Sequence, residues 1–391
     1  MSLPRLGLIG VHGYGSLHLR EVARLAAAGR ARLVACADIK APAAEAARTL
    51  EELGAEYWSD WKSMLDEHEK LDVVVVATPP HRHAEMAVAA MERGAHVLVE
   101  KPPVVTLEDF EGLLGTADRR GVACQVGFQS TASGALGRFR ELRSSEVLGD
   151  GAAIGATGRW QRDFEYWSRA SWAGKESLAG APVRDGALTN PFAHAVMNCL
   201  VVAGTADIEA VEVERFRANP IEVDDTGCLR VTMKGGQRFV VAVTLCAEDM
   251  EPPALRLSGP KGSAGWAYES DVLWVRSGSQ SWTEAFARRS LLEELLDFVA
   301  GRVDRLSCPL SSCRRFVELV EVIHAAPVVD IAADFVRWTG EAGRRRPAIA
   351  GIDRAVAQSV EEQRLFSELG PAVAPFARLS GRPVATAPGL G

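Results

Sequence analysis

Residues Val73–Pro103, VVVVATPPHRHAEMAVAAMERGAHVLVEKPP, decide the fold of this 391-residue chain. Four consecutive valines indicate a strand at Val73–Ala77 that is covered on both faces, as strands are in a parallel sheet between two layers of helices. After a Pro-Pro turn and a helix, a second strand, His96–Val99, leads directly into Glu100-Lys101-Pro102. Because open α/β sheets bind ligands at the carboxyl ends of their strands, the sequence predicts a ligand site that contains Lys101.

The bulk composition is typical of a globular protein with two domains. A length of 391 residues allows two separate cores, and contents of 47% hydrophobic and 24% charged residues are ordinary. The formal net charge of −7 argues against nucleic acid or an anionic membrane as a partner. No apolar run approaches the length of a membrane span, and the one basic run, Arg344–Arg346, is expected to be a solvated loop rather than a phosphate site. We therefore expect a small-molecule partner, and neither nucleic acid nor membrane.

The cysteines predict a reducing compartment. Seven are scattered along the chain without a CxxC pair, and this is typical of free thiols in a cytoplasmic protein. Cys308 and Cys313 have no histidine near them in the sequence, so we expect no metal there. His81 and His83 form an HxH pair, but no carboxylate or thiolate is close on the strand side, and we expect no metal at this turn either.

A glycine-rich loop follows the first expected strand, Arg5–Gly10, and precedes a helix expected over Ser16–Ala28. Gly10 and Gly15 occupy the places where a dinucleotide loop needs a tight turn and close packing of helix on strand. His12 replaces the glycine that should contact the pyrophosphate, and a glycine is displaced by one position. A side chain at this place would crowd the phosphates unless the loop follows a different path.

The next expected strand, Arg32–Ala37, ends in Asp38. An acid there accepts hydrogen bonds from the adenosine ribose and repels a 2′-phosphate, which favours NAD over NADP. Lys40 keeps NADP possible. The alternative interpretation of Asp38 is a turn residue after a strand.

The chain resembles the glucose-fructose oxidoreductase / inositol dehydrogenase / rhizopine-catabolism (Gfo/Idh/MocA) family. The resemblance covers residues 5–130 and is carried by Gly10…Gly15 with His18, Asp38, Thr78-Pro79-Pro80…His83 and Glu100-Lys101-Pro102. It implies a Rossmann dinucleotide-binding domain followed by an α/β domain with a large, open, mostly antiparallel sheet. It also implies that Lys101 hydrogen-bonds the reacting hydroxyl or carbonyl group. The cofactor-binding residues that it implies are Gly10, His12, Gly13, Tyr14, Gly15, Asp38, Thr78, Pro79, His83, Glu100 and Lys101.

The expected organisation has three parts. Residues 1–126 form the Rossmann domain, residues 127–330 form the substrate and oligomerisation domain, and residues 331–391 form a C-terminal helical extension and tail. Short strands between Ala210 and Val275 would build the open sheet, and the resemblance implies a homodimer or homotetramer through it. In the last part we expect helix at Ala332–Trp338 and Ile352–Leu369, and a frayed tail at Arg378–Gly391.

Two segments of the second domain are candidates for contact with substrate. Asp163–Lys175, DFEYWSRASWAGK, is either a loop that packs on its own tryptophans or a loop over the substrate cleft. In Asp185–Leu200 the family usually has an aspartate and, four residues later, a histidine; here Asn190 and His194 hold these places. The resemblance therefore makes Lys101, Asn190 and His194 the candidate catalytic residues. The candidate substrate-binding residues are these three together with Trp172 and Lys175.

Three functions remain open. The leading hypothesis is an NAD(P)-dependent oxidoreductase that transfers a hydride between nicotinamide and a carbinol or carbonyl carbon of a sugar, polyol or related cyclic compound, with Lys101 and His194 handling the proton. A second is NAD-dependent elimination at a glycosidic bond, without net change in the cofactor. A third is a non-catalytic nucleotide-binding or scaffold protein on the same fold, which His12 and Asn190 favour.

Overall fold

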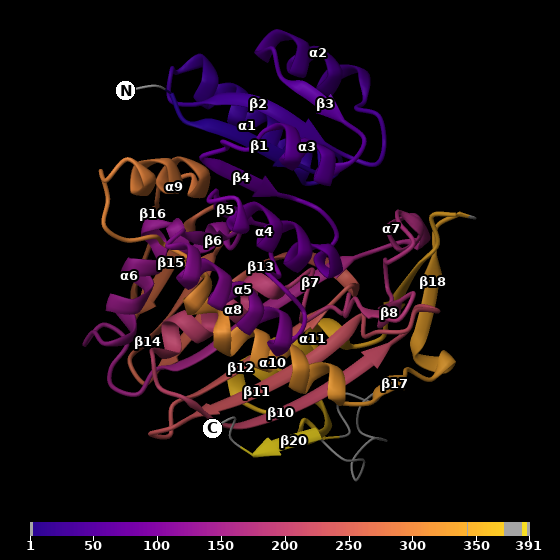
Figure 1. Cartoon of the computed structure of the whole chain (residues 1–391). Coiled ribbons are helices and arrows are strands. Elements are labelled where there is room, and N and C mark those ends of the chain that lie inside the picture. The colour runs from indigo at the N-terminus through magenta and orange to yellow at the C-terminus, as the bar shows by residue number, and fades with distance from the viewer. Residues whose placement is uncertain (1–2, 342, 371–384, 389–391) are drawn as a thin grey trace. The chain divides into compact units, whose positions relative to one another are not determined.

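The chain folds into two compact units (Figure 1). The structure is a computed structural model, and it describes residues 3–341, 343–370 and 385–388. The first unit comprises residues 1–132 together with 289–314, and the second comprises residues 133–288 together with 315–391. Each unit therefore includes a segment from late in the sequence.

The first unit is built on a six-stranded sheet in the order β3-β2-β1-β4-β5-β6. All neighbouring strands in it are parallel. In chain order the strands are β1 (Arg5–Ile9), β2 (Arg32–Ala37), β3 (Glu56–Trp58), β4 (Val73–Val76), β5 (His96–Val99) and β6 (Cys124–Val126). The four valines of β4 are fully buried, as a central strand between helix layers requires. This arrangement confirms the predicted Rossmann-type sheet.

Helices connect these strands and supply the rest of the first core. They are α1 (Gly15–Ala27), α2 (Ala44–Leu53), α3 (Trp61–Glu67), α4 (His83–Glu92) and α5 (Leu107–Arg120). A further helix, α9 (Leu291–Val299), begins at Ser290, whose hydroxyl accepts a hydrogen bond from the Glu293 N–H. Figure 1 shows it in orange beside β5, and its leucines are part of the same buried cluster as Leu6 and Leu8 of β1.

The second unit contains a ten-stranded, mostly antiparallel sheet. Its main path is β16-β15-β14-β13-β7-β12-β11-β10-β17, and β20 pairs with β10. The strands are β7 (Ala153–Gln161), β10 (Ile208–Arg217), β11 (Thr226–Met233), β12 (Arg238–Thr244), β13 (Cys246–Gly259), β14 (Gly262–Ala267), β15 (Val272–Ser277), β16 (Gln280–Ala285), β17 (Val328–Asp330) and β20 (Ala385–Pro388). Only the β7–β12 and β10–β17 pairs are parallel. The predicted open, mostly antiparallel sheet is confirmed.

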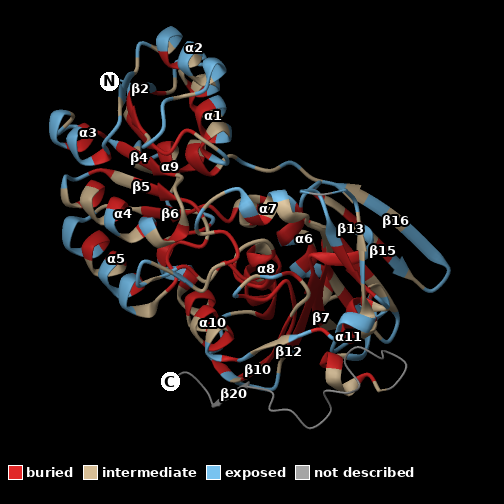
Figure 2. Ribbon diagram, turned by 90° about the vertical axis from the view of Figure 1, so that its right-hand side faces the viewer, coloured by how far each residue is buried: buried red, intermediate tan, exposed pale blue. Residues whose placement is uncertain are grey.

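Helices cover both faces of this sheet. On β7, a Cβ at Gly158 would overlap the ring of Phe192, which caps α8 (Ala193–Ala203), whereas a Cβ at Gly155 would overlap Val360 of α11 (Ile352–Glu362). Positions 155 and 158 point to opposite faces because successive side chains alternate along a strand. Figure 2 shows α8 buried along nearly its whole length. The remaining helices of this unit are α6 (Gly134–Arg143), the short α7 (Phe164–Ser168) and α10 (Arg314–Ala325).

The C-terminal part differs from the sequence-based expectation. The segment expected as helix at Ala332–Trp338 is a short 3-10 turn, Ala333–Phe335, followed by strand β18 (Val336–Thr339), which pairs with β19 (Arg346–Ile349). The β-branched and aromatic residues of β18 favour a strand once a partner is available. The helix expected over Ile352–Leu369 ends at Glu362, because Gln363 takes a left-handed conformation with φ of 56°.

The expected tail also contains one regular element. Strand β20 lies within it and pairs antiparallel with β10, whereas residues 371–384 and 389–391 lie outside the described residues. The prediction of a tail without structure was therefore wrong for residues 385–388. Strand β20 pairs with β10, which lies far earlier in the chain, and local sequence patterns do not reveal such a partner.

Replacement of Phe366 with alanine should destabilise the second unit strongly. Phe366 is fully buried in a cluster that includes Phe216, Val356 and Ile352. Loss of an aromatic side chain from such a core costs about 3–5 kcal/mol, which urea denaturation followed by circular dichroism would measure. The control is Glu361→Ala on the exposed side of α11, which should change stability by less than about 0.5 kcal/mol. Equal effects of the two substitutions would contradict this packing.

Candidate active site

The loop between β1 and α1 depends on two glycines. Gly10 has φ of +94°, and a Cβ there would overlap the carbonyl oxygen of Ala77 at the end of β4. A Cβ at Gly15 would overlap the carbonyl oxygen of Gly10. The loop therefore passes too close to β4 and to itself for any larger residue, and α1 begins directly after it. This is the geometry that presents a helix N-terminus to a phosphate group.

The imidazole of His12 is bonded to Asp38. Its Nδ1 lies 3.0 Å from Oδ2 of Asp38, and the same oxygen accepts a hydrogen bond from the Val11 N–H over 2.9 Å. Oδ1 accepts from the Lys40 N–H. Although partial burial opposes ionisation, these hydrogen bonds hold the pKa of Asp38 below its usual value. Asp38 is therefore an ionised, oriented hydrogen-bond acceptor at the end of β2, and His12 occupies one of the acceptor positions on its Oδ2.

These residues fit a dinucleotide. The Gly10–Gly15 loop leaves room for phosphates at the start of α1, and at Gly13 even a Cβ would meet no atom within 4 Å. Asp38 offers a carboxylate at the carboxyl end of the neighbouring strand, where a ribose is recognised in this type of fold. When bound, NAD would supply a hydride acceptor or donor at its nicotinamide ring. The assignment of individual residues to the cofactor stays a prediction.

His83 ties the ends of β4 and β5 together. It is fully buried, with Nδ1 2.8 Å from the Pro102 carbonyl oxygen and Nε2 2.7 Å from the Thr78 carbonyl oxygen. Burial lowers its pKa. The neutral imidazole has one N–H and so donates to one of these two carbonyl oxygens, while its ring lies against both the Thr78-Pro79 turn and the Lys101-Pro102 step, whose peptide bond is cis.

Glu100 anchors the residue before the candidate catalytic lysine. Its carboxylate is buried; Oε1 lies 2.7 Å from Nε2 of His18 and accepts from Nε2 of Gln129 over 3.0 Å. A Cβ at Gly127 would lie only 2.7 Å from Oε1, so this position admits no side chain. Lys101, half-buried, follows directly, and its backbone N–H donates to Oε2 of Glu100 over 3.2 Å. The lysine thus projects from a backbone that three neighbouring segments hold.

In the second unit, Asn190 is oriented by a buried carboxylate. Its Nδ2 donates to Oδ1 of Asp185 over 2.6 Å, while Oδ2 accepts from the Gly174 N–H over 2.8 Å and pairs with Arg169 at 3.3 Å. The Asp185 side chain is fully buried. Because Nδ2 is turned towards Asp185, the amide oxygen of Asn190 points away from it as an acceptor.

His194 lies in the first turn of α8, one residue after Ala193. Its ring is half-buried, and the ring centroids of His194 and Tyr268 lie 6.1 Å apart. Phe192, which precedes the helix, packs against Trp160 of β7 with 4.5 Å between ring centroids. Asn190, Phe192 and His194 therefore share one end of α8.

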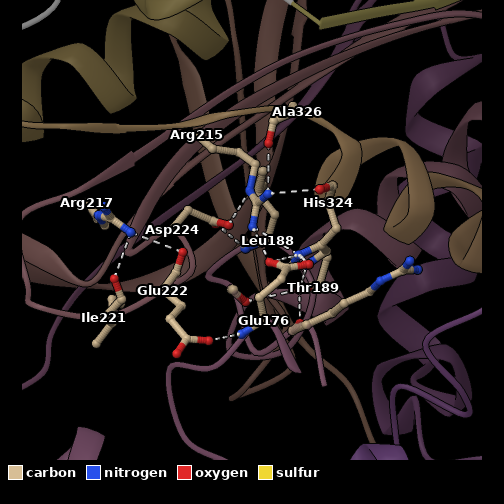
Figure 3. A network of polar contacts seen from close by, with 12 residues as sticks. Glu176, Leu188, Thr189, Arg215, Arg217, Ile221, Glu222, Asp224, His324 and Ala326 are labelled. Carbon is tan, nitrogen blue, oxygen red and sulfur yellow. Dashed lines mark hydrogen bonds and ion pairs between the residues drawn. The ribbon is translucent and has the colours of Figure 1, made fainter. Parts of the chain in front are cut away.

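A network of buried polar groups holds the segment before α8 (Figure 3). Oγ1 of Thr189 lies 3.0 Å from Nε2 of His324, and Nδ1 of His324 lies 2.8 Å from Oε2 of Glu176. Arg215 donates from Nε to Oδ1 of Asp224 over 2.8 Å, and both side chains are almost completely buried. Burial lowers the pKa of His324. A buried ion pair that also bonds backbone groups fixes the local conformation more than it adds stability.

The two other predicted substrate residues have different surroundings. Trp172 lies beneath the guanidinium group of Arg169, 4.7 Å from ring centroid to Cζ. Lys175 forms an exposed ion pair with Glu222 over 2.7 Å, with more than two fifths of each side chain exposed. Trp172 is linked to Asn190 through Arg169 and Asp185, and the Lys175 carbonyl oxygen accepts a hydrogen bond from the Asp185 N–H over 3.2 Å.

Sequence analysis missed three residues that shape the site: Asp185, Gly127 and His324. Asp185 opens the quoted segment Asp185–Leu200 and is the one with a usable signal, because an acid five residues before an amide can fold back onto it in a turn. The partners of Gly127 and His324 lie far away in the sequence, which no local pattern indicates.

Neither a metal-binding cluster nor a membrane-spanning helix is found in the described residues. Within residues 3–341, 343–370 and 385–388, no group of three or more His, Cys, Asp or Glu side chains is arranged to hold a metal ion. Among the helices of the same residues, none is long and apolar enough to cross a membrane. All seven cysteines are buried and free of disulfides.

Residues 5–128 match the model of the oxidoreductase family with an NAD-binding Rossmann fold, Gfo/Idh/MocA. The match covers this N-terminal part of the chain, which is similar to the Gfo/Idh/MocA oxidoreductases. The family predicted from sequence is confirmed, and so is NAD as the cofactor of this type of domain.

Curated relatives agree with this assignment. The levoglucosan dehydrogenase of Pseudarthrobacter phenanthrenivorans is 28% identical over 46% of this chain and 45% of its own length. The NAD⁺-dependent scyllo-inositol 2-dehydrogenase of Bacillus subtilis is 33% identical over 32% of this chain and 35% of its own length. The chain thus matches less than half the length of these relatives.

Solved structures extend the similarity of fold to most of the chain. The WlbA dehydrogenase from Bordetella pertussis, solved with NADH and UDP-GlcNAcA, has a TM-score of 0.67 at 22% identity and covers 83% of this chain and 96% of its own. A levoglucosan dehydrogenase in complex with NADH and levoglucosan has a TM-score of 0.66 at 21% identity and covers 81% of this chain and 95% of its own. At these identities the similarity shows the fold.

Replacement of His12 with alanine should tighten NAD⁺ binding. The substitution frees one acceptor site on Oδ2 of Asp38 for a ribose hydroxyl, and we expect about three- to tenfold higher affinity in calorimetric titrations with NAD⁺. Arg48→Ala on the exposed face of α2 is the control and should leave affinity unchanged. Weaker binding by the His12 variant would mean that the ring itself contacts the cofactor.

Proposed function

We propose that the protein is an NAD-dependent oxidoreductase that transfers a hydride between nicotinamide and a carbinol or carbonyl carbon of a sugar, polyol or related cyclic compound. The observation that carries the proposal is the position of Lys101. It follows β5 of an NAD-binding Rossmann sheet, and Glu100 and His83 hold the backbone on either side of it. A cation fixed at the carboxyl end of a parallel strand is suited to bind the oxygen of the reacting carbon.

Three side chains divide the chemistry in this proposal. Lys101 hydrogen-bonds the reacting oxygen and moves its proton, which balances removal of a hydride from the carbon. His194 donates to or accepts from a second substrate oxygen. Asn190, whose amide is fixed by Asp185, accepts a hydrogen bond from a substrate hydroxyl. Trp172 and Lys175 are further proposed substrate-binding residues.

The proposed nucleotide is NAD rather than NADP. Asp38 is ionised, and two backbone N–H groups and His12 orient it. A 2′-phosphate placed there would meet a negative charge.

The proposal extends to compartment and assembly. Seven free thiols suit the reducing cytoplasm.

A homodimer or homotetramer would form through the face of the sheet that α11 covers only in part. Strand register places Gly155, Arg256, Gly265 and Trp274 on this face, and Trp274 stands in β15, outside the cluster around α11. Mass photometry would test the assembly.

Replacement of Lys101 with alanine should abolish turnover and spare cofactor binding. We expect kcat to fall by about 100- to 10,000-fold, the usual contribution of a group that transfers a proton. The substrate would be the most active compound from a screen of sugars and polyols, followed by NADH absorbance. Calorimetry should show NAD⁺ affinity within a few-fold of the original, and Lys70→Ala, an exposed lysine of the same unit, should retain full activity. Turnover that survives in the Lys101 variant would overturn the assignment.

Asp185→Asn should reduce activity through Asn190. An amide at 185 no longer fixes which atom of the Asn190 amide faces outward, so kcat/KM should fall by about tenfold without global unfolding. The matched control, Asp207→Asn, alters an exposed acid that pairs with Lys234. Unchanged kcat/KM in the Asp185 variant would remove Asn190 from the proposed machinery.

A further inference from the structure

Arginine and aromatic side chains alternate between the end of β7 and the segment after α7. The guanidinium carbon of Arg162 lies 4.5 Å from the ring centroid of Trp160 and 5.0 Å from that of Tyr166. On the other side, the Arg169 guanidinium carbon lies 3.9 Å from the Tyr166 centroid and 4.7 Å from that of Trp172. The order is therefore Trp160, Arg162, Tyr166, Arg169, Trp172, which we call the arginine–aromatic stack.

The β18–β19 hairpin packs against Phe164, which lies within the segment that carries the stack. The Phe164 N–H donates to the Arg345 carbonyl oxygen over 3.1 Å, and the Phe164 ring lies 5.4 Å from the Trp338 ring. Asp163 caps α7 by accepting from the Tyr166 N–H over 3.0 Å. The β18–β19 hairpin thus braces α7, and the two arginines are presented in a fixed arrangement rather than on a free loop.

The two arginines differ in how their charge is compensated. Arg169 pairs with the buried carboxylate of Asp185 at 3.3 Å. In the described part of the chain, Arg162 has no carboxylate oxygen within 4.0 Å; its Nη1 donates to the Gln161 carbonyl oxygen over 3.0 Å, and its side chain also hydrogen-bonds Tyr166. Glu269 is a further charged group near it, and Glu269 also faces Arg288.

The half-buried arginines of the second unit are of two kinds, and Arg162 belongs with those that bond carbonyl oxygens. Arg159, Arg230 and Arg256 are paired with carboxylates, and Arg143 and Arg315 bond the carbonyl oxygens of helix and loop ends. A guanidinium that makes cation–π contacts with two rings has five N–H groups, of which those not already bonded can donate to an anion.

The stack reaches the start of α8. Trp160 contacts the Arg162 guanidinium on one side and the Phe192 ring, at 4.5 Å, on the other. Phe192 lies between Asn190 and His194 in the sequence. At the other end, Arg169 shares Asp185 with Asn190. Arg169 is thus linked to Asn190 through Asp185, and Arg162 is linked through Trp160 to Phe192, which stands between Asn190 and His194 in the sequence.

We propose that Arg162 binds an anionic group of the substrate, a carboxylate or a phosphate carried by the sugar or cyclitol ring. The proposal rests on the proposed function and narrows its substrate class from neutral polyols to acidic ones. Trp160 and Tyr166 hold the guanidinium plane, and Arg162 donates two parallel N–H bonds to two oxygens of the anion. Arg169, neutralised by Asp185, is a positioning residue that holds Tyr166 in the stack.

The test compares binding of charged and neutral sugars to the full-length protein in the presence of NADH. The probes are glucuronate, glucose 6-phosphate and glucose, titrated calorimetrically into the unaltered protein and into Arg162→Gln. We expect one of the two anionic probes to bind more tightly than glucose. Arg162→Gln should lower the affinity for this probe by about 10- to 100-fold and change the affinity for glucose by less than about threefold. The probe that binds identifies carboxylate or phosphate as the group.

Two further variants separate recognition from folding. Arg162→Lys keeps the charge but not the planar guanidinium group. Its affinity for the anionic probe should therefore lie between the affinities of the unaltered protein and of Arg162→Gln. Arg276→Gln, which removes an exposed arginine of β15, should bind all probes as the unaltered protein does. Circular dichroism melting should show that each variant is folded.

The outcomes distinguish this inference from the proposed function. Anion binding that is lost in Arg162→Gln, without NADH formation from any sugar, would support the site and count against the dehydrogenase. NADH formation from neutral sugars that Arg162→Gln leaves unchanged would support the dehydrogenase and overturn the site. Failure of both anionic probes to bind, or equal binding to the unaltered protein and Arg162→Gln, would also overturn it.

Discussion

The arrangement of the first unit around Lys101 depends on the hydrogen bonds of the buried Glu100 carboxylate. This carboxylate is removed from water at the end of β5, and its charge is acceptable there only because His18 of α1 and Gln129 beyond β6 both contact Oε1. Gly127 is required because any side chain would displace the same oxygen. One buried charge thus sets the distance between a helix, a strand end and a loop, and Lys101 takes its direction from that arrangement.

The second unit uses the same principle with two carboxylates. Asp185 and Asp224 are both fully buried, and together they bind the backbone or side chains on either side of the turn that leads into α8. A turn built only from small residues would have many conformations, whereas a turn that must satisfy two buried charges has few. Asn190 stands where the family resemblance implies an acid, and a buried carboxylate, that of Asp185, lies five residues earlier and accepts from its amide nitrogen.

Much of the fold could be predicted because its signals are local. The valines of β4, the paired glycines at 10 and 15 and the Glu100-Lys101-Pro102 step each determine the structure of their own segment. The family resemblance then supplied the order of the domains. Sequence patterns were weaker where a segment takes its structure from a distant partner, as β18 does from β19 and β20 from β10.

The candidate site shows the same division between local and distant signals. The loop, Asp38 and Lys101 could be named from spacing alone. The direction of the His12 ring could not, because it depends on how the end of β2 lies beside the loop. The alternation of Arg162 and Arg169 with three aromatic rings was visible in the sequence only as a crowd of aromatics and cations, since the stacking partners are set by α7 and by the distant β18–β19 hairpin.

The late segments have a consequence for synthesis on the ribosome. Residues 1–132 contain all six strands of the first sheet, but their core lacks the leucines of α9 until residue 299 has been made. The sheet of the second unit likewise lacks α11 until residue 362. Neither core is complete until its late helix has been made, so part of the apolar surface of each sheet stays uncovered while the intervening residues are synthesised, and the nascent chain is prone to aggregation during that interval.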